Sequence, residues 1–455
     1  MAESRRFFIR QVATIGSVAL TFGFEVDPLW AAECGKPVSP DDCTLPAPPA
    51  ATQYTPNEPV VRTRYSALEM ADPSRATQLQ QFRDAICLVR NLPPTDVISW
   101  TKLVAQHCIN CARSNTSNIH YDQQFLPWHR ALLYFLEREL RKLSGNDDVR
   151  LVYWDWENAA SRYLPAIYAP QDQPLYWANR GDLNGPNWPL TYDETNVQPL
   201  LAIPDFKTFG GSDTQKQPVP AAYSGPHANV HNNFSPGDMA NLQYSPRDPV
   251  FYAHHGNIDR LWSSWVAAGH SNPDFGTAKV YFYDETRTWR YVLMNDLRDT
   301  RKLGYEYSSL MQPRVSIRSL QSLSVSRSAN RLALSAAATR EVNLPAPEFL
   351  VITNIRNLDA FPPDTLRYGI FAGKPPVGTA AGSTSTFLGM ASRVLSDGHA
   401  HSEPLSAALD ISNRIAQITA GGPASLDLHV AALDESERTT TEAIPLVADS
   451  IRVIG

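Results

Sequence analysis

The sequence predicts a mainly α-helical domain with long loops, followed by a small β-sandwich. Apolar residues recur at helical spacing in three stretches, Arg75 to Asn91, Ala131 to Leu143 and His254 to Ala268. Beyond Pro345 the pattern changes to short alternating apolar runs that turn residues separate, which is typical of a sandwich. The two patterns divide the chain into a helical part and a β part.

The N-terminal segment is similar to an export signal. Arg5 and Arg6 precede an apolar run from Val12 to Phe24, which is too short to span a bilayer. This arrangement predicts a twin-arginine signal peptide in residues 1–32 and export to a bacterial periplasm or the medium. A chance arginine pair before an apolar helix is the alternative. The proline-rich stretch 33–61 predicts an extended strap over the first domain.

Proline and glycine set the expected boundaries of the helices. The first helix should stop at Pro93 and Pro94, because proline cannot continue a helix. The second should follow His129 and end at Gly145. Residues 163–224 carry many Pro, Gly and Asn residues, so loops are expected there.

A change of composition marks the junction between the two parts. Residues 315–344 are rich in Ser, Arg, Ala and Leu and predict a linker that is open to proteases. The predicted division is a signal peptide at 1–32, a catalytic domain at 33–314, this linker and a sandwich at 345–455. Strands are expected at Phe349–Ile352, Leu366–Ile370, Thr386–Leu388, Leu426–Val430 and Ile451–Ile454.

Composition excludes several kinds of partner. The chain has 455 residues, of which 43% are hydrophobic and 19% charged, as expected for a globular protein. The formal net charge is −6 and there is no basic run, which argues against nucleic acid and anionic membranes as partners. No membrane span is predicted, and phosphate-binding glycine loops and serine-nucleophile motifs have no good match.

The histidines carry the chemistry. Seven of the eleven lie between His107 and His255, in two separate clusters. The first cluster contains His107, His120 and His129, and the second contains His227, His231, His254 and His255. Three imidazoles from each cluster would make two adjacent all-nitrogen metal sites. Because imidazole suits copper, zinc, iron and nickel, the ligand type alone leaves the metal open.

Spacing limits which histidines can share a metal. His227 and His231 stand four residues apart, so both rings lie on one face of a helix, although structural histidines also show this spacing. His254 and His255 are roughly 100° apart on a helix, so one metal cannot easily take both. Asp259, one turn after His255, is a candidate acceptor for the second N–H of a metal-bound imidazole. An ion pair at the helix surface, with Arg260 or another basic residue, is the alternative.

At these residues the chain resembles the type-3 copper proteins, and among them the plant-type polyphenol oxidases, which are catechol oxidases and tyrosinases. The resemblance extends from about Arg75 to Tyr305. It implies a tyrosinase-like helical bundle as the catalytic domain. The motifs that carry it are Gln106–Cys111, Phe125–Arg130, Tyr134–Arg138, Tyr153–Trp156, Arg247–Trp262 and Leu297–Tyr305.

The resemblance implies two copper ions as cofactors, with O2 as co-substrate. One copper would be bound by His107, His120 and His129 and the other by His227, His231 and His255, with His254 behind the site or near its rim. The implied reaction oxidises catechols to o-quinones and reduces O2 to water. A hemocyanin-like oxygen carrier and a dizinc hydrolase are the alternatives; the latter lacks carboxylate ligands.

Cysteine usage follows from the same resemblance. It implies a thioether between Cys111 and His120 and a disulfide from Cys108 to the N-terminal segment, with Cys43 preferred to Cys34. Cys87 lies in an amphipathic helical stretch and is interpreted as a buried thiol.

Residues expected near the metal site indicate which phenols the protein would oxidise. Family members that hydroxylate monophenols carry a glutamate and an asparagine where this chain has Tyr223 and Ala228, so catechols or o-aminophenols are favoured as substrates. Asn232 is expected to line the pocket. Leu242 replaces a bulky phenylalanine of some plant enzymes and should widen the pocket mouth. The resemblance also implies that the C-terminal domain shields the active site.

Overall fold

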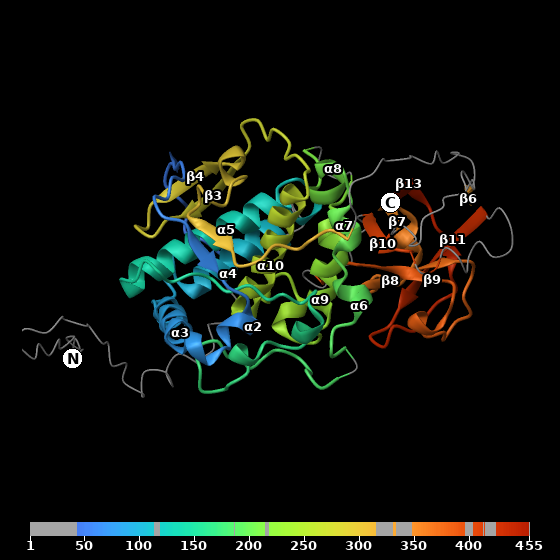
Figure 1. Ribbon diagram of the computed structural model, residues 1–455, viewed down its shortest axis with the longest axis horizontal. Helices are drawn as coiled ribbons and strands as arrows, with labels where there is room; N and C mark the ends of the chain where they lie inside the picture. The colour runs from blue at the N-terminus through green and yellow to red at the C-terminus, as the bar shows by residue number, and fades with distance from the viewer. Residues whose placement is uncertain are drawn as a thin grey trace, which may run out of the picture.

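The computed structural model describes residues 43–112, 119–185, 187–213, 218–314, 331–333, 348–395, 404–412, 414 and 425–454. A helical domain and a β-rich domain lie side by side (Figure 1). The fold class predicted from the sequence is therefore confirmed. The predicted signal peptide at 1–32 and Cys34 lie outside the described residues.

Helix α5 is the centre of the helical domain, and both α3 and α10 pack against it. Its apolar side is wholly buried, which is what the leucine-rich spacing of this segment predicts. The longer helices are α3 (Ala76–Arg90), α4 (Trp100–His107), α5 (Phe125–Ser144) and α10 (Val250–Ala267). The shorter ones are α2 (Ala67–Met70), α6 (Tyr192–Thr195), α7 (Gln198–Leu201), α8 (Phe206–Gly210) and α9 (Ala228–Asn232).

Two of the predicted helices begin earlier than expected. Helix α5 begins at Phe125, and Pro127 falls within its first turn, where a missing N–H costs no hydrogen bond. Helix α10 begins at Val250, directly after Pro249. The C-terminal end of α5 was predicted correctly, since Gly145 adopts a left-handed conformation with φ 64°.

The described part of the strap lies along the helical domain as expected. β1 (Thr52–Gln53) pairs in parallel with β4 (Trp289–Leu293), which pairs with β3 (Lys279–Tyr283). β2 (Arg62–Arg64) pairs in parallel with β5 (Tyr305–Tyr307). These small sheets were not predicted. β1, β2 and β5 have only two or three residues each and pair with strands that are distant in sequence, whereas β3 and β4 are neighbours in the chain.

The β-rich domain consists of two antiparallel sheets whose inner residues share one core. One sheet has the order β10-β7-β13, formed by Leu405–Asp410, Phe349–Ile355 and Ala448–Ile454. The other has the order β12-β11-β8-β9, formed by Ile444–Pro445, Ser425–Leu433, Arg367–Ala372 and Phe387–Ser392. All five expected strands are present, while β10 and β12 were missed. β6 (Arg331–Ala333) falls within the predicted linker and pairs with β11.

The sandwich packs against the side of the helical domain that carries α6, α7 and α9 (Figure 1). Hydrogen bonds cross this boundary from Ser224 Oγ to the Ser406 carbonyl (2.7 Å) and from the Leu242 N–H to the Leu395 carbonyl (2.9 Å). Among the described helices, none combines the length and the apolar composition that a bilayer-spanning segment needs.

Candidate metal centre

Three elements bring the first histidine cluster together. His107 is the last residue of α4, His120 lies in the short 3-10 helix Ile119–Tyr121, and His129 lies in the second turn of α5. All three rings are buried, at 2% exposure or less. The ring centres are 5.0 Å apart for His120 and His129, and 5.6 Å apart for His107 and each of the others. The sequence cluster is therefore also a cluster in space.

The second cluster comes from α10 and from the turn that leads into α9. Gly225 has a non-helical conformation and Pro226 follows it, so the chain kinks directly before His227. The ring of His227 lies 4.6 Å from that of His231 and 5.1 Å from that of His255. His254 also belongs to this group, whose potential ligand atoms all lie within 4.8 Å of one another.

The two clusters face each other. The rings of His129 and His255 stack at 4.1 Å with an angle of 6° between their planes. The rings of His120 and His227 lie 5.6 Å apart. The structure thus brings all six predicted ligands into two adjacent groups, as the sequence pattern predicts.

Burial keeps these imidazoles neutral. Loss of solvent lowers the pKa of His129 to about 3 and that of His231 to about 4, against small increases from backbone hydrogen bonds. The pKa values of His107, His120, His227 and His255 also lie well below the usual value, first because of burial and then because of the neighbouring imidazoles. A neutral imidazole has a free lone pair, which is the form that binds a metal.

Hydrogen bonds show which nitrogen carries that lone pair. The Nδ1 atoms of His129 and His231 lie 2.7 and 2.6 Å from the carbonyl oxygens of Phe125 and Met239. Because a carbonyl only accepts, Nδ1 donates in both rings and Nε2 is left as a buried acceptor with no hydrogen-bond partner among the described residues.

Such buried lone pairs are costly unless something binds them. Both ring nitrogens of His227 and His255 also lack a hydrogen-bond partner in the described part of the chain. Backbone carbonyls that orient metal-bound imidazoles are common in metal sites. The residues therefore fit two metal ions, each bound by nitrogen atoms.

Asp259 does not have the role predicted for it. Its carboxylate accepts hydrogen bonds from Arg130, Tyr305 and Tyr307, and Arg64 lies 3.6 Å away. The alternative was an ion pair with Arg260 or another basic residue. The partner is another basic residue, because Arg130 pairs with Asp259 while Arg260 pairs with Glu157, and the Asp259 pair is buried and not at the helix surface. The buried side chains of Arg64 and Arg130 both lie beside the Asp259 carboxylate. The carboxylate therefore stabilises the packing of the helical domain instead of orienting an imidazole.

One cysteine prediction is confirmed, one is wrong, and the thioether between Cys111 and His120 stays a prediction. Cys43 and Cys108 form a disulfide with a Cα–Cα distance of 5.5 Å. Cys111 is a buried free thiol, and burial raises its pKa well above the usual value. The interpretation of Cys87 as a free thiol is wrong, because Cys87 is disulfide-bonded. Its helical, apolar surroundings gave no sign of this pairing.

Among the predicted pocket residues, Tyr223 lies beside both histidine clusters. The Tyr223 ring is wholly buried and lies 5.3 Å from His120 and 5.2 Å from His227. Ala228 and Leu242 belong to an apolar cluster with the Cys43–Cys108 disulfide and Val394. The space beside Leu242 is thus occupied by a residue of the sandwich instead of forming an open mouth.

The segment Arg393–Leu395 of the sandwich covers these residues. The Asn232 amide donates to the Arg393 carbonyl (2.9 Å), and the Val394 N–H donates to the Tyr223 hydroxyl (3.4 Å). The Leu395 carbonyl accepts from the Leu242 N–H. Each backbone unit of this segment therefore contacts a predicted pocket residue, and no sequence motif predicts this particular contact.

A helical domain that presents two facing groups of buried imidazoles defines the class of type-3 copper proteins. Comparison with protein families agrees. Residues 97–179 and 176–268 match the common central domain of tyrosinase, and residues 270–319 match the polyphenol oxidase middle domain. The chain belongs to the tyrosinase and polyphenol oxidase family, whose type-3 centre holds two copper ions.

Similar proteins include chloroplastic polyphenol oxidases of Vitis vinifera, 28% identical over 344 residues, and of Malus domestica, 29% identical over 352 residues. These matches cover 65% and 66% of this chain and 56% and 58% of the relatives. Aureusidin synthase of Antirrhinum majus is 27% identical, with 62% of this chain and 59% of the relative covered. The chain thus spans somewhat more than half of the length of the curated relatives that it matches.

Solved structures show the same fold. Latent apple tyrosinase matches 89% of this chain and 100% of its own, with a TM-score of 0.64 and 21% identity. Polyphenol oxidase from Grenache grape (Vitis vinifera) matches 62% of this chain and 96% of its own, with a TM-score of 0.53 and 26% identity.

Proposed function

We propose that this chain is a copper-dependent oxidase of o-diphenols. His107, His120 and His129 bind one copper ion, and His227, His231 and His255 bind the other. The observation that carries the proposal is a pair of facing groups of three buried imidazoles each, in which the rings of His129 and His255 stack. When bound, the copper pair would supply two-electron chemistry: two catechols and one O2 give two o-quinones and two waters.

The residues of the chain prepare the site for that chemistry. The carbonyls of Phe125 and Met239 hold the rings of His129 and His231 with Nε2 free for metal. Aromatic rings, among them Tyr223 and Phe251, pack around the imidazoles and exclude water. An apolar surface of this kind suits a flat phenolic ring.

Catechols and o-aminophenols are the proposed substrates, ahead of monophenols. Hydroxylation of a monophenol needs a group that takes the phenolic proton. At the two positions beside His227 where that group is expected, the chain has the apolar ring of Tyr223 and the methyl group of Ala228. Neither side chain is a carboxylate or an amide.

Domain boundaries and export are part of the proposal. The helical domain would extend over residues 33–314 and the sandwich over 345–455, on either side of a linker at 315–344. Residues 1–32 would be removed after export by the twin-arginine route. The paired arginines before the short apolar run support this, and N-terminal sequencing of protein from the culture medium or periplasm tests it.

Metal analysis and turnover test the function together. The copper-loaded protein should hold about two coppers per chain and oxidise catechol. His231→Ala should lose one copper and all oxidase activity, since one ion alone cannot exchange the two electrons. His429→Ala is the matched control, because this histidine lies on β11 of the sandwich, away from both clusters. Zinc in place of copper, or dioxygen binding without turnover after the linker is cut, would contradict the proposal.

A further inference from the structure

The second cluster contains one imidazole more than a three-histidine site needs. His254 is completely buried, and its ring lies 5.4 Å from that of His227 and 4.8 Å from that of His231. His255, the next residue, is equally buried. Distance alone therefore does not decide which of the two neighbours would bind a metal.

A hydrogen bond from Trp156 distinguishes them. The indole Nε1 of Trp156 lies 3.1 Å from Nδ1 of His254. An indole N–H can only donate, so Nδ1 of His254 must accept and carries no proton. A neutral imidazole then has its proton on Nε2. This is the opposite of His129 and His231, where a carbonyl holds the proton on Nδ1.

Both nitrogens of His254 are thereby unsuited to bind a metal. The lone pair of Nδ1 points to the indole, and Nε2 carries the proton. Because Nδ1 accepts a hydrogen bond, the ring is not the doubly protonated cation. Nε2 of His254 has no hydrogen-bond partner among the described residues. His255 has no such restriction, since neither of its nitrogens has a hydrogen-bond partner among the described residues.

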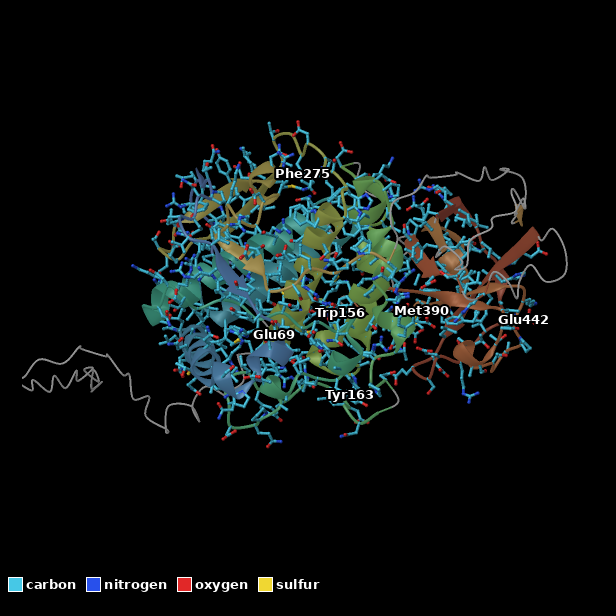
Figure 2. All side chains as sticks on the ribbon, viewed as in Figure 1. Glu69, Trp156, Tyr163, Phe275, Met390 and Glu442 are labelled. Atoms are coloured by element: carbon cyan, nitrogen blue, oxygen red, sulfur yellow. A yellow bond between two sulfur atoms is a disulfide. The ribbon has the colours of Figure 1, made fainter. Side chains whose placement is uncertain are left out.

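Backbone packing explains why Trp156 reaches this ring. The Trp154 N–H donates to the Ala253 carbonyl (2.9 Å), which ties the segment to α10. A Cβ atom on Gly256 would lie 3.2 Å from Cβ of Tyr153, so the absence of a side chain there permits the close approach. Figure 2 shows Trp156 in the interior of the helical domain, and its side chain is fully buried.

We propose that the Trp156 indole N–H fixes the tautomer of His254 and keeps this histidine from binding metal. The second cluster then offers three imidazoles, from His227, His231 and His255, and leaves a coordination position open. A fourth imidazole would fill the position that a phenolic oxygen needs. This inference rests on the proposed copper pair, and Trp156 acts in it as a positioning residue.

The tautomer can be measured in the metal-free protein. With ¹⁵N-labelled histidine, the wild-type His254 signal, assigned by its loss in His254→Gln, should show a protonated Nε2 and an unprotonated Nδ1. Trp156→Phe removes the donor and should move the proton to Nδ1 in part or all of the molecules. Trp154→Phe is the matched control: its indole is as deeply buried and donates to the Ser161 carbonyl (2.6 Å), so the His254 shifts should stay as in wild type.

Copper coordination provides the second readout. X-ray absorption of the copper-loaded protein should give about three imidazoles per copper in wild type and Trp154→Phe, and more in Trp156→Phe. His254→Leu should keep both coppers. The double variant Trp156→Phe/His254→Leu should return to the wild-type number, since the extra ligand is gone.

A proton on Nδ1 of His254 in the wild-type protein would overturn the inference, and this measurement needs no core variant to fold well. Loss of one copper in His254→Leu would overturn it too, because His254 would then be a ligand. Failure of the proposed function is a different result: wild-type protein would not bind two coppers, while the tautomer would still be read in the metal-free chain.

Discussion

Weakening the contact between the two domains should release the active site. The intact chain is expected to oxidise catechol slowly, because the segment Arg393–Leu395 lies over Tyr223, Asn232 and Leu242. The perturbation that tests this contact is Arg367→Met. Arg367 lies on β8 of the sandwich and reaches across the boundary to the helical domain.

The expected rise in catechol oxidation follows from the contacts that Arg367 makes with the helical domain. Nη1 of Arg367 lies 3.8 Å from Oε1 of Glu194, with side-chain exposures of 6% and 2%, and Nη2 lies 3.4 Å from Oδ1 of Asn233. Hydrogen bonds to charged groups are worth about 1.5–3 kcal/mol, and these long contacts belong at the lower end, at about 2 kcal/mol. Since 1.4 kcal/mol is a factor of ten, the open fraction should rise roughly 30-fold.

The assay is the initial rate of catechol oxidation by the copper-loaded intact chain. Trypsin-cut protein gives the upper limit, with cleavage expected at Arg318, Arg327, Arg331 or Arg340, of which only Arg331 is among the described residues. Arg356→Met is the control, because Arg356 pairs with Asp449 inside the sandwich and both side chains are partly exposed. Its rate should change by no more than about a factor of two.

Two results would refute the reasoning in different ways. If cutting the linker leaves the rate unchanged, the sandwich does not gate the site and is a permanent stabilising cap. If cutting raises the rate but Arg367→Met does not, the domain gates the site but this ion pair contributes little to its docking.

Two further predictions concern the same regions. Cys111 and His120 should be joined by a thioether, so mass spectrometry of the alkylated, copper-loaded protein should show their peptides linked and two hydrogens lighter; a freely alkylated Cys111 in fully active enzyme would reject the link. Domain docking should weaken as the pH rises from 4.5 to above 7. Burial, with the nearby carboxylates of Asp193 and Glu194, raises the pKa of Glu437 from 4.5 to about 7, against the lowering effect of Arg367. Because the docked state favours the protonated carboxyl, Glu437 stabilises docking below pH 4.5, and this contribution is lost as the pH rises through 7. For this partly exposed group the loss is about 1–2 kcal/mol, and Glu437→Gln should flatten the pH dependence of the activity ratio between intact and cut protein.

The fold could be read from the sequence where its signals are local. Helical spacing and a terminal Gly145 located α5, and alternating runs located five strands of the sandwich. β10 was missed because Leu405–Asp410 contains two small alanines and alternates only weakly. The pairing of β1 with β4 joins residues that are more than two hundred positions apart, so no local pattern reveals it.

The sequence predicted which histidines form the two clusters but not how their rings are oriented. Their clustering and spacing located both groups, but the orientation of each ring depends on partners that carry no motif, such as the Phe125 carbonyl. Asp259 was misjudged because its spacing from His255 is right while its carboxylate is bound by Arg130, a residue remote in sequence. The pairing of Cys87 was equally hidden, because disulfide connectivity depends on the fold and not on spacing.

One apolar cluster contains both the neighbour of the predicted copper ligand His107 and Val394, a residue of the sandwich that covers the predicted pocket. Cys108 directly follows His107, its disulfide partner Cys43 lies in the strap, and Val394 of the sandwich packs on both together with Ala228 and Leu242. Lifting the sandwich exposes this apolar surface to water, at a cost of about 25 cal/mol per Å². A phenolic ring that replaces Val394 would bury the same surface again. A catechol bound at this position would compete with Val394, so more apolar catechols should favour the open chain.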